Sequence, residues 1–311
     1  GRYSYKAANH PALLSAMLVR SDGQLKATAV NQALAAAGQR LKEIAAVGGT
    51  IAAIVSPFLT VEEAFLLASY VKELSASSVL FLGPVPTQGQ DQVYKPDQHT
   101  GRTGDVSFVV PRPFTIRAEK CPNRRGVEAI LQHYQGAVLP FSDLGARLAK
   151  KEFRALYVTH NAIDPWQDEA SAKALRAGVE FLLVQDAHSS PLSAQADIVL
   201  AGATFAEKAG SYVNADGRIQ YSEAALPPRD GSLPDLDLLA ILKGRPGAGP
   251  IHSRDVLAEL AAAVQAFSVA SGGIVPEFGV PLAGTDGQAT LPEAHPYNDP
   301  WSVSRYARTV H

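Results

Sequence analysis

Short, almost wholly apolar runs separated by helical periodicity constrain the fold of this chain more than any other feature. The runs IAAIV at 51–55 and ALYVT at 155–159 are typical of strands that are buried on both faces of a sheet. Between such runs, apolar residues recur at helical spacing, most clearly from Val30 to Ala45. Strands that alternate with helices predict an α/β fold with a doubly wound, mostly parallel sheet.

Further elements alternate in the same way along the chain. A capping box, in which Thr60 and Glu63 satisfy each other's backbone donors, predicts a helix that runs to Leu74. Other strands are expected at 79–82, 179–184 and 197–201, with a weaker signal at 106–110. Other helices are expected at 126–135, 167–176, 236–242 and 254–267, with a short helical turn at 190–196.

The distribution of Pro, Gly and aromatic residues suggests how the chain divides. We expect an α/β region over residues 1–245, followed by a C-terminal helix and an extended tail over 246–311. The polar, Gly- and Pro-rich stretch 85–112 allows an alternative division, with a second lobe around 78–150. The start at Gly1 suggests a processed or trimmed product.

Charge and cysteine content argue against several classes of protein. The net charge is −2 and no basic block is present, so nucleic acid is not an expected partner. The single cysteine, Cys121, cannot form an internal disulfide or hold an iron–sulfur cluster or structural zinc. Its isolation favours a reducing, cytoplasmic setting. No apolar run reaches the length of a membrane span, so we expect membrane association only through a partner complex.

The ends of the predicted strands are where a ligand would bind, because open parallel sheets bind ligands at their carboxyl edge. The Asp-x-His pair Asp186 and His188, together with His160, suggests either a metal site or an acid–base pair. We favour the alternative in which they bond to the loop and cap the next helix, since their spacing matches no tight metal motif. We therefore assign no catalytic or metal-binding residue. The strand-end candidates are Ser56, Gly83, His160, Asn161, Asp186, His188 and Thr204.

Common catalytic and nucleotide-binding motifs are missing from the sequence. No Gly-x-Gly-x-x-Gly follows a strand, and neither a phosphate-binding Gly-Lys-Ser/Thr loop nor a Gly-x-Ser-x-Gly elbow occurs. Lys120, Arg124 and Arg125 could lower the pKa of the Cys121 thiol. No histidine base is close in sequence, so we favour an unreactive thiol.

One segment, ADIVLAGATFAEKAGSYVNADGRIQ at 196–220, is more specific than the rest. It resembles the signature of molybdopterin oxidoreductases, in which an ADIVLP-like strand precedes a Glu-Lys, a Gly-Thr/Ser, an Asn and a Gly-Arg-x-Gln. PNRRG at 122–126 and the region 56–74 also resemble that family, and the likeness covers roughly residues 1–225. The matching positions are Asp197, Glu207, Lys208, Gly210, Ser211, Asn214, Gly217, Arg218 and Gln220.

The resemblance implies a sheet of the molybdopterin-oxidoreductase type, here reduced in size. It also implies cofactor contacts for Glu207, Asn214 and Arg218. The alternative, which we favour, is that these residues serve turn formation and that Arg218 pairs with Glu207. Cluster cysteines, a metal-ligand setting for Cys121 and a C-terminal barrel are all missing from this sequence, in contrast to catalytic members. We therefore expect no cofactor to be bound by this chain.

Three functions follow as hypotheses. The first is a non-catalytic scaffold in a complex like NADH-quinone oxidoreductase, whose large iron–sulfur subunit the chain resembles most, with iron–sulfur proteins and other subunits as partners. The second is a fragment or subunit of a catalytic molybdenum or tungsten oxidoreductase such as a formate dehydrogenase. The third is a nucleotide-binding α/β module that uses the strand-end crevice near Ser56, His160 and Asp186.

Overall fold

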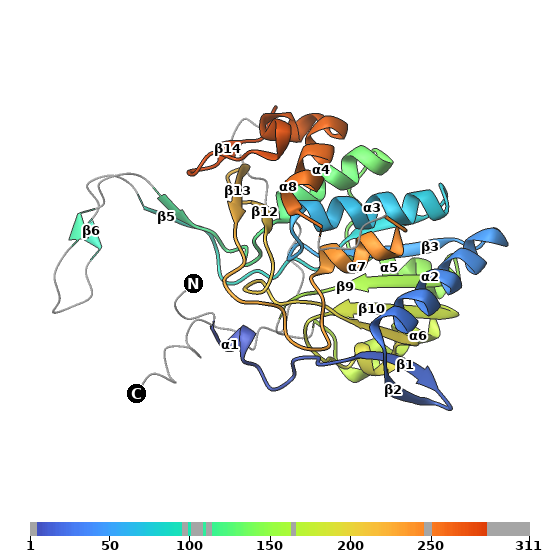
Figure 1. The fold of residues 1–311 in the computed structure, drawn as a ribbon. Coiled ribbons are helices and arrows are strands. Elements are labelled where there is room, and N and C mark those ends of the chain that lie inside the picture. Colours follow the sequence, from blue (N-terminus) through green and yellow to red (C-terminus); the bar gives the residue numbers. More distant parts are fainter. Residues whose placement is uncertain are drawn as a thin grey trace, which may run out of the picture. The chain divides into compact units, whose positions relative to one another are not determined.

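A central sheet with helices on both faces dominates the structure, which is a computed structural model (Figure 1). The structure describes residues 5–94, 99–100, 108–109, 114–162, 166–245 and 251–284.

The sheet has seven strands in the described part of the chain, in the order β2-β1-β11-β10-β9-β3-β4. The five strands from β11 to β4 run parallel, whereas β1 pairs antiparallel with both β2 and β11. Every residue of β3, β9, β10 and β11 is buried, because helices cover both faces. The strands are β1 (Met17–Ser21), β2 (Gln24–Thr28), β3 (Ile51–Val55), β4 (Val79–Leu82), β9 (Ala155–Thr159), β10 (Phe181–Asp186) and β11 (Ile198–Ala201).

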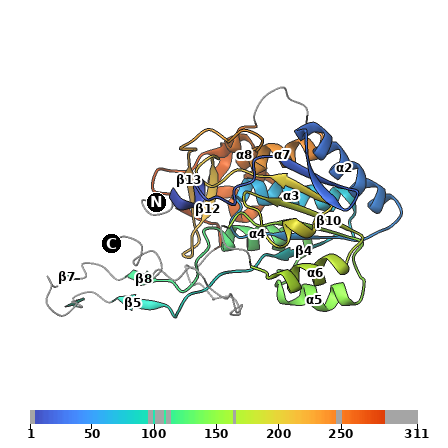
Figure 2. The same cartoon turned by 90° about the horizontal axis from the view of Figure 1, so that it is seen from below.

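The helices lie in two layers. Figure 2 shows α2, α3 and α7 on one face of the sheet and α5 and α6 on the other, while α4 packs on α3 and β4. None of the helices in the described ranges is long and apolar enough to cross a membrane. The helices are α1 (Tyr5–Ala8), α2 (Val30–Ala46), α3 (Val61–Leu74), α4 (Arg124–Gln135), α5 (Ser142–Ala149), α6 (Glu169–Ala177), α7 (Asp235–Leu242) and α8 (Ser253–Ala263), with 3-10 segments η1 (Ser193–Gln195) and η2 (Gln265–Gly273).

The strand order reverses between β3 and β9. From β3 the chain passes through α3 to β4 on one side, and β9, β10 and β11 then add successively on the other side of β3. At such a switch point the connections leave in opposite directions, so a crevice opens at the carboxyl ends of the two strands. The predicted residues Ser56 and His160 follow these strands directly.

A second, smaller sheet covers the start of α3. Its strands β12 (Gly210–Val213), β13 (Arg218–Ser222) and β14 (Val280–Pro281) are antiparallel. The β12–β13 turn is the Asn-Ala-Asp-Gly stretch of the signature segment, and Gly217 has a φ of 77° there. The C-terminal part of the signature segment 196–220 therefore forms a hairpin outside the main sheet.

The predicted doubly wound α/β architecture with a mostly parallel sheet is confirmed. The strand predicted at 179–184 lies two residues later, and the helix predicted at 254–267 ends at Ala263 because Val264 is extended (φ −115°, ψ 110°). Of the weak strand signal at 106–110, Phe108–Val109 form β7, and the other residues lie outside the described ranges. The elements that were not predicted include the β1–β2 and β12–β13 hairpins, α5 and β14.

The chain forms two compact units, and their boundaries differ from the expected boundary at residue 245. One unit comprises 1–84 and 122–290, and the other comprises 85–121 and 291–311. Helix α8 belongs to the first unit because it packs on α3 and β12. The expected tail beyond residue 284 lies outside the described residues.

The second unit consists, where it is described, of paired short strands. Strand β5 (Gln92–Tyr94) pairs antiparallel with β8 (Phe114–Ile116), and β6 (His99–Thr100) pairs antiparallel with β7. Asp91 accepts hydrogen bonds from Arg117 at 2.9 Å and from the backbone N–H of Ala118 at 2.8 Å. The Cys121 thiol, which is half-buried, donates to Glu119 at 3.4 Å.

Candidate functional site

The switch point of the sheet is closed by hydrogen bonds between its own strand ends. The Ser56 hydroxyl donates to the backbone carbonyl of His160, and the Thr159 hydroxyl accepts from the Ser56 N–H at 3.1 Å. The Thr159 hydroxyl in turn donates to the carbonyl of Ile54 at 2.7 Å. Gly83, at the end of β4, approaches so closely that an added Cβ would lie 3.0 Å from the Ser56 Cα. The predicted candidates Ser56 and Gly83 thus join strands together.

Asp186, at the end of β10, connects the next three candidates. Its Oδ2 lies 3.0 Å from Nδ1 of His160, and its Oδ1 accepts from the N–H groups of Asn161 (3.3 Å) and His188 (3.2 Å). Asp186 is almost completely buried, so these contacts replace the water that a carboxylate needs. The prediction that Asp186 bonds to the loop is confirmed, but in this structure Asp186 caps no helix.

His188 is held from one side only. Its Nε2 lies 3.1 Å from the carbonyl of Ala7, so Nε2 carries the proton and Nδ1 is an acceptor. Nδ1 is buried and has no partner, and burial lowers the pKa of His188. The His10 ring packs edge-on against it, with 5.7 Å between the ring centroids. His188 is therefore a neutral, buried imidazole at the carboxyl edge of the sheet.

Glu207 binds the loop after β11. Its Oε2 accepts from both the N–H and the hydroxyl of Thr204 at 2.8 Å, and its Oε1 accepts from Arg229 at 2.8 Å. The expected pair between Arg218 and Glu207 is therefore wrong. Arg229 pairs with Glu207 instead of Arg218. It lies beyond the signature segment, where the chain returns from the β12–β13 hairpin to the main sheet.

Asn214 and Arg218 shape the β12–β13 hairpin, as the turn chemistry predicted. The Asn214 side-chain oxygen accepts from the N–H groups of Asp216 and Arg218, both at 3.0 Å. The Arg218 guanidinium donates to the carbonyl of Gly279 at 2.8 Å and thereby ties β13 to the segment before β14.

Lys208 lies at the centre of a buried polar cluster that sequence reasoning missed. Its amine donates to Glu63 at 2.8 Å and to Asp235 at 2.9 Å. Asp235 also accepts from Gln185 at 2.7 Å and from Asn161 at 2.8 Å, so the cluster reaches the strand-end candidates. Burial disfavours the charged amine, but the charges of Asp235 and Glu63 outweigh that effect and raise the pKa of Lys208.

Glu62, the neighbour of Glu63, attaches the small sheet to α3. Both of its carboxyl oxygens accept from the N–H of Ser211, at 2.9 and 3.1 Å, and the side chain is fully buried. Burial raises the pKa of Glu62 to about 7. Burial likewise raises the pKa of Glu63 to about 7, against the attraction of Lys208. The signal in the sequence was the pair of acids at the start of a helix whose next five residues are all apolar.

No group of three or more His, Cys, Asp or Glu within the described ranges is placed to hold a metal ion.

Comparison with known proteins identifies the segment that contains most of these residues. Residues 136–244 match the family model of molybdopterin oxidoreductases. This part of the chain is similar to a molybdopterin oxidoreductase domain. The match includes β9, β10 and β11, the signature segment and α7.

Several redox proteins are similar to parts of this chain. The chain is 35% identical over 80 residues to an NADH-quinone oxidoreductase subunit of Streptomyces coelicolor, and this match covers 26% of this chain and 10% of that protein. It is 36% identical over 104 residues to the NADPH-Fe(3+) oxidoreductase subunit alpha of Geobacter sulfurreducens, covering 33% and 12%. It is 28% identical over 137 residues to formate dehydrogenase H of Escherichia coli, covering 43% and 18%. The matched segments thus span less than a fifth of each relative.

The three residues matched to the family's cofactor segment are already engaged. Both Glu207 oxygens accept hydrogen bonds, the Asn214 oxygen accepts two, and Arg218 donates to a carbonyl. A pterin that bound through these atoms would have to replace hydrogen bonds that they already make within the chain. In this structure Glu207 therefore holds the loop after β11, and Asn214 and Arg218 hold the β12–β13 hairpin.

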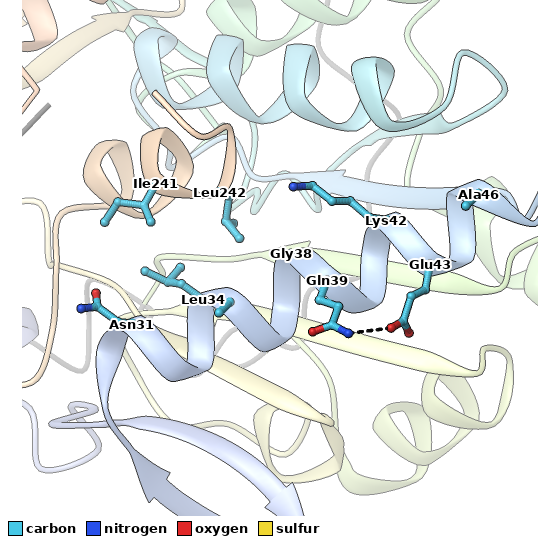
Figure 3. A pocket seen from close by; sticks show the side chains of 10 residues that line it. Asn31, Leu34, Gly38, Gln39, Lys42, Glu43, Ala46, Ile241 and Leu242 are labelled. Carbon is cyan, nitrogen blue, oxygen red and sulfur yellow. Dashed lines mark hydrogen bonds between the residues drawn. The ribbon is translucent and has the colours of Figure 1, made fainter. Parts of the chain in front are cut away.

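A groove of about 800 Å³ lies along α2 beside α7 (Figure 3). Its lining is mostly apolar and includes Leu34, Gly38 and Leu242. At its polar end, Gln39 donates to Glu43 at 2.9 Å. None of the strand-end candidates lines this groove, so the two features are separate.

Gly210 marks the close approach between the small sheet and α3. A Cβ at this position would lie 2.5 Å from Cγ2 of Thr60 and 3.0 Å from Oε2 of Glu62. We expect Gly210→Ala to lower the free energy of unfolding by about 1–3 kcal/mol through overpacking. The measurement is urea unfolding followed by circular dichroism.

The control for Gly210→Ala is Gly145→Ala in α5, where an added Cβ has nothing within 4 Å. This variant should be unchanged or gain up to about 1 kcal/mol from helix propensity. Equal effects of the two substitutions would contradict the close packing of β12 on α3.

Proposed function

We propose that this chain is a non-catalytic scaffold in a redox complex of the NADH-quinone oxidoreductase type, either as a subunit or as a domain of one. In this proposal it is a degenerate molybdopterin oxidoreductase and binds no pterin. One observation carries the proposal: Glu207, Asn214 and Arg218 are held by atoms of the chain itself.

The proposed partners are other subunits of the complex, including iron–sulfur proteins. Within these 311 residues the single Cys121 cannot ligate a cluster, so the electron carriers would belong to other parts of the complex. Relatives named as subunits of NADH-quinone oxidoreductase support this choice among the branches of the family. We place the chain in the cytoplasm, at a membrane only through its complex.

The experiment is metal and pterin analysis of the purified chain. The chain is produced in cells that make molybdopterin and are supplied with molybdate and tungstate, and an active molybdenum enzyme from the same cells serves as control. We expect far less than one Mo or W atom per chain and no extractable pterin. Stoichiometric metal or pterin would overturn the scaffold proposal.

A catalytic fragment is the second candidate. The similarity to formate dehydrogenase H extends over 43% of this chain and favours it. It requires that formate oxidation with an artificial dye appears when the chain is mixed with the subunits that co-purify with it. Absence of this activity, with the control enzyme active, supports the scaffold.

A nucleotide-binding module is the third candidate. Its support is that Nδ1 of His188 and Oδ1 of Asn161 are buried acceptors without a partner at the carboxyl edge of the sheet. Titration calorimetry with NADH and ATP separates this candidate from the scaffold, which predicts no binding heat from either.

A further inference from the structure

Three carboxyl groups and one amine are buried together where α3 begins. Glu62, Glu63 and Asp235 are at most 1% exposed, and Lys208 is 4% exposed. If all four groups are ionised, their net charge is −2. Buried groups avoid uncompensated charge by taking up or releasing protons.

The hydrogen bonds indicate which carboxyl groups take up the proton. Asp235 accepts from three donors, one of them the Lys208 amine. Glu63 accepts through Oε2 only, from Lys208 and from the N–H of Thr60, while its Oε1 is buried without a partner. The two oxygens of Glu62 accept from the N–H of Ser211, and its further contacts, with its own N–H and with the hydroxyls of Ser211 and Thr60, do not offset its burial. Of the three carboxyl groups, those of Glu62 and Glu63 are therefore the less well supplied with hydrogen-bond donors.

Few other charged groups on the neighbouring helices and strands face Glu62 and Glu63. Tyr212 on β12 faces both carboxyl groups and Lys208, and burial raises its pKa, so it remains a neutral phenol. On α4, Arg124 pairs with Glu128 of the same helix at 2.7 Å. On α8, Arg254 pairs with Glu223 at 3.1 Å. From β9, Tyr157 faces Asp235 and donates to Gln185, and its pKa too is raised by burial.

The pair is also the point at which the small sheet is attached. Glu62 binds the N–H of Ser211, and Gly210 contacts Thr60 and Glu62 at distances that leave no room for a side chain. A further bond joins the N–H of Val213 to the side-chain oxygen of Asn123 at 2.8 Å. Hydration of Glu62 therefore requires β12 to move away from α3.

We propose that the Glu62–Glu63 pair binds a proton from solvent and thereby controls how firmly the β12–β13 hairpin is attached to α3. With the proton bound, the cluster carries one negative charge less and the hairpin stays closed. When the proton returns to solvent, the carboxylate is favoured in water, and the hairpin opens more often. This inference does not depend on the proposed scaffold function.

Burial supports this assignment, since it raises the pKa of both Glu62 and Glu63 to about 7. An exposed carboxyl has its ordinary pKa of 4.5. Between these values the closed hairpin holds a proton that the open hairpin has released, so opening increases with pH over this range.

The first test is a titration of the unaltered chain labelled with ¹³C at the glutamate carboxyl carbon. We expect a resonance whose chemical shift titrates with a midpoint near pH 7, well above an ordinary glutamate. This resonance should disappear or move in Glu62→Gln or Glu63→Gln. If every glutamate titrates with a midpoint near 4.5, the proposal is wrong, whether or not the variants fold.

The second test is hydrogen exchange at the amides of Ser211 and Val213, corrected for the intrinsic pH dependence of exchange. For the unaltered chain the opening constant should rise about tenfold between pH 6 and 8. It should stay constant within about twofold in the double variant Glu62→Gln/Glu63→Gln. The control Glu43→Gln, on the exposed side of α2, should keep the tenfold rise. A rise of equal size in the double variant would overturn the proposal.

Discussion

Replacing Lys208 by methionine is expected to lower the free energy of unfolding by about 3–5 kcal/mol at pH 8, because a buried ion pair then loses one partner. The amine bonds Glu63 at 2.8 Å and Asp235 at 2.9 Å, and all three side chains are at most 2% exposed. Methionine has a similar length, so the loss reflects charge more than volume. The measurement is denaturant unfolding at 25 °C.

The effect of Lys208→Met should be smaller at pH 5. At that pH the Glu63 carboxyl takes up a proton, and less uncompensated charge stays buried. The matched control is Lys26→Met, which removes an ion pair with the same 2.9 Å separation from Asp22 at an exposed position. That substitution should change stability by less than about 1 kcal/mol. Similar losses at the two positions would contradict the central role of Lys208 in the core.

Raising the pH from 5 to 8 is expected to destabilise the chain through Glu62 and Glu63. Their pKa values in the folded state, about 7, lie above the ordinary 4.5. The folded chain therefore holds protons that the unfolded chain has released, so stability is lost as the pH rises from 4.5 through 7 and is constant above. The single proton held by this pair contributes roughly 3 kcal/mol to this loss. Unfolding curves at half-unit steps of pH measure it.

Glu62→Gln tests the contribution of one carboxyl group. Glutamine has the shape of the protonated acid and keeps an oxygen that can accept from the Ser211 N–H. We expect nearly equal stability at pH 5 and a gain of roughly 2–3 kcal/mol over the unaltered chain at pH 8. Glu73→Gln, at the exposed end of the same helix, should follow the unaltered chain at both pH values. A Glu62→Gln chain less stable at pH 8 would show that the ionised carboxylate is needed.

The main sheet could be predicted because its strands are buried on both faces. Runs such as 51–55 and 155–159 have to be apolar throughout, and that requirement is visible locally. The β1–β2 hairpin was missed for the opposite reason. Its second strand, Gln24–Thr28, lies at the sheet edge with mostly polar, partly exposed residues, which sequence alone does not distinguish from a loop.

Topology predicted the strand-end candidates. Their hydrogen-bond and ion-pair partners, however, come from distant parts of the sequence. Asp186 and His160 were predicted and do lie together, at 3.0 Å. Asp235 and Arg229, which neutralise Lys208 and Glu207, are 27 and 22 residues away in sequence. Such pairings depend on the return of the chain from the small sheet to the main sheet. Local turn chemistry, as at Asn214, was predictable because its partners are within four residues.

The proposed scaffold role of this chain in a redox complex can be tested on the complex itself. The most direct measurement is native mass spectrometry of the intact complex that contains the chain, combined with elemental analysis for Mo, W and Fe. We expect the chain in fixed stoichiometry with iron-containing subunits, and neither Mo nor W in the mass of the chain itself. A chain that carries one Mo or W together with a pterin, or that occurs only without iron-containing partners, would contradict the account.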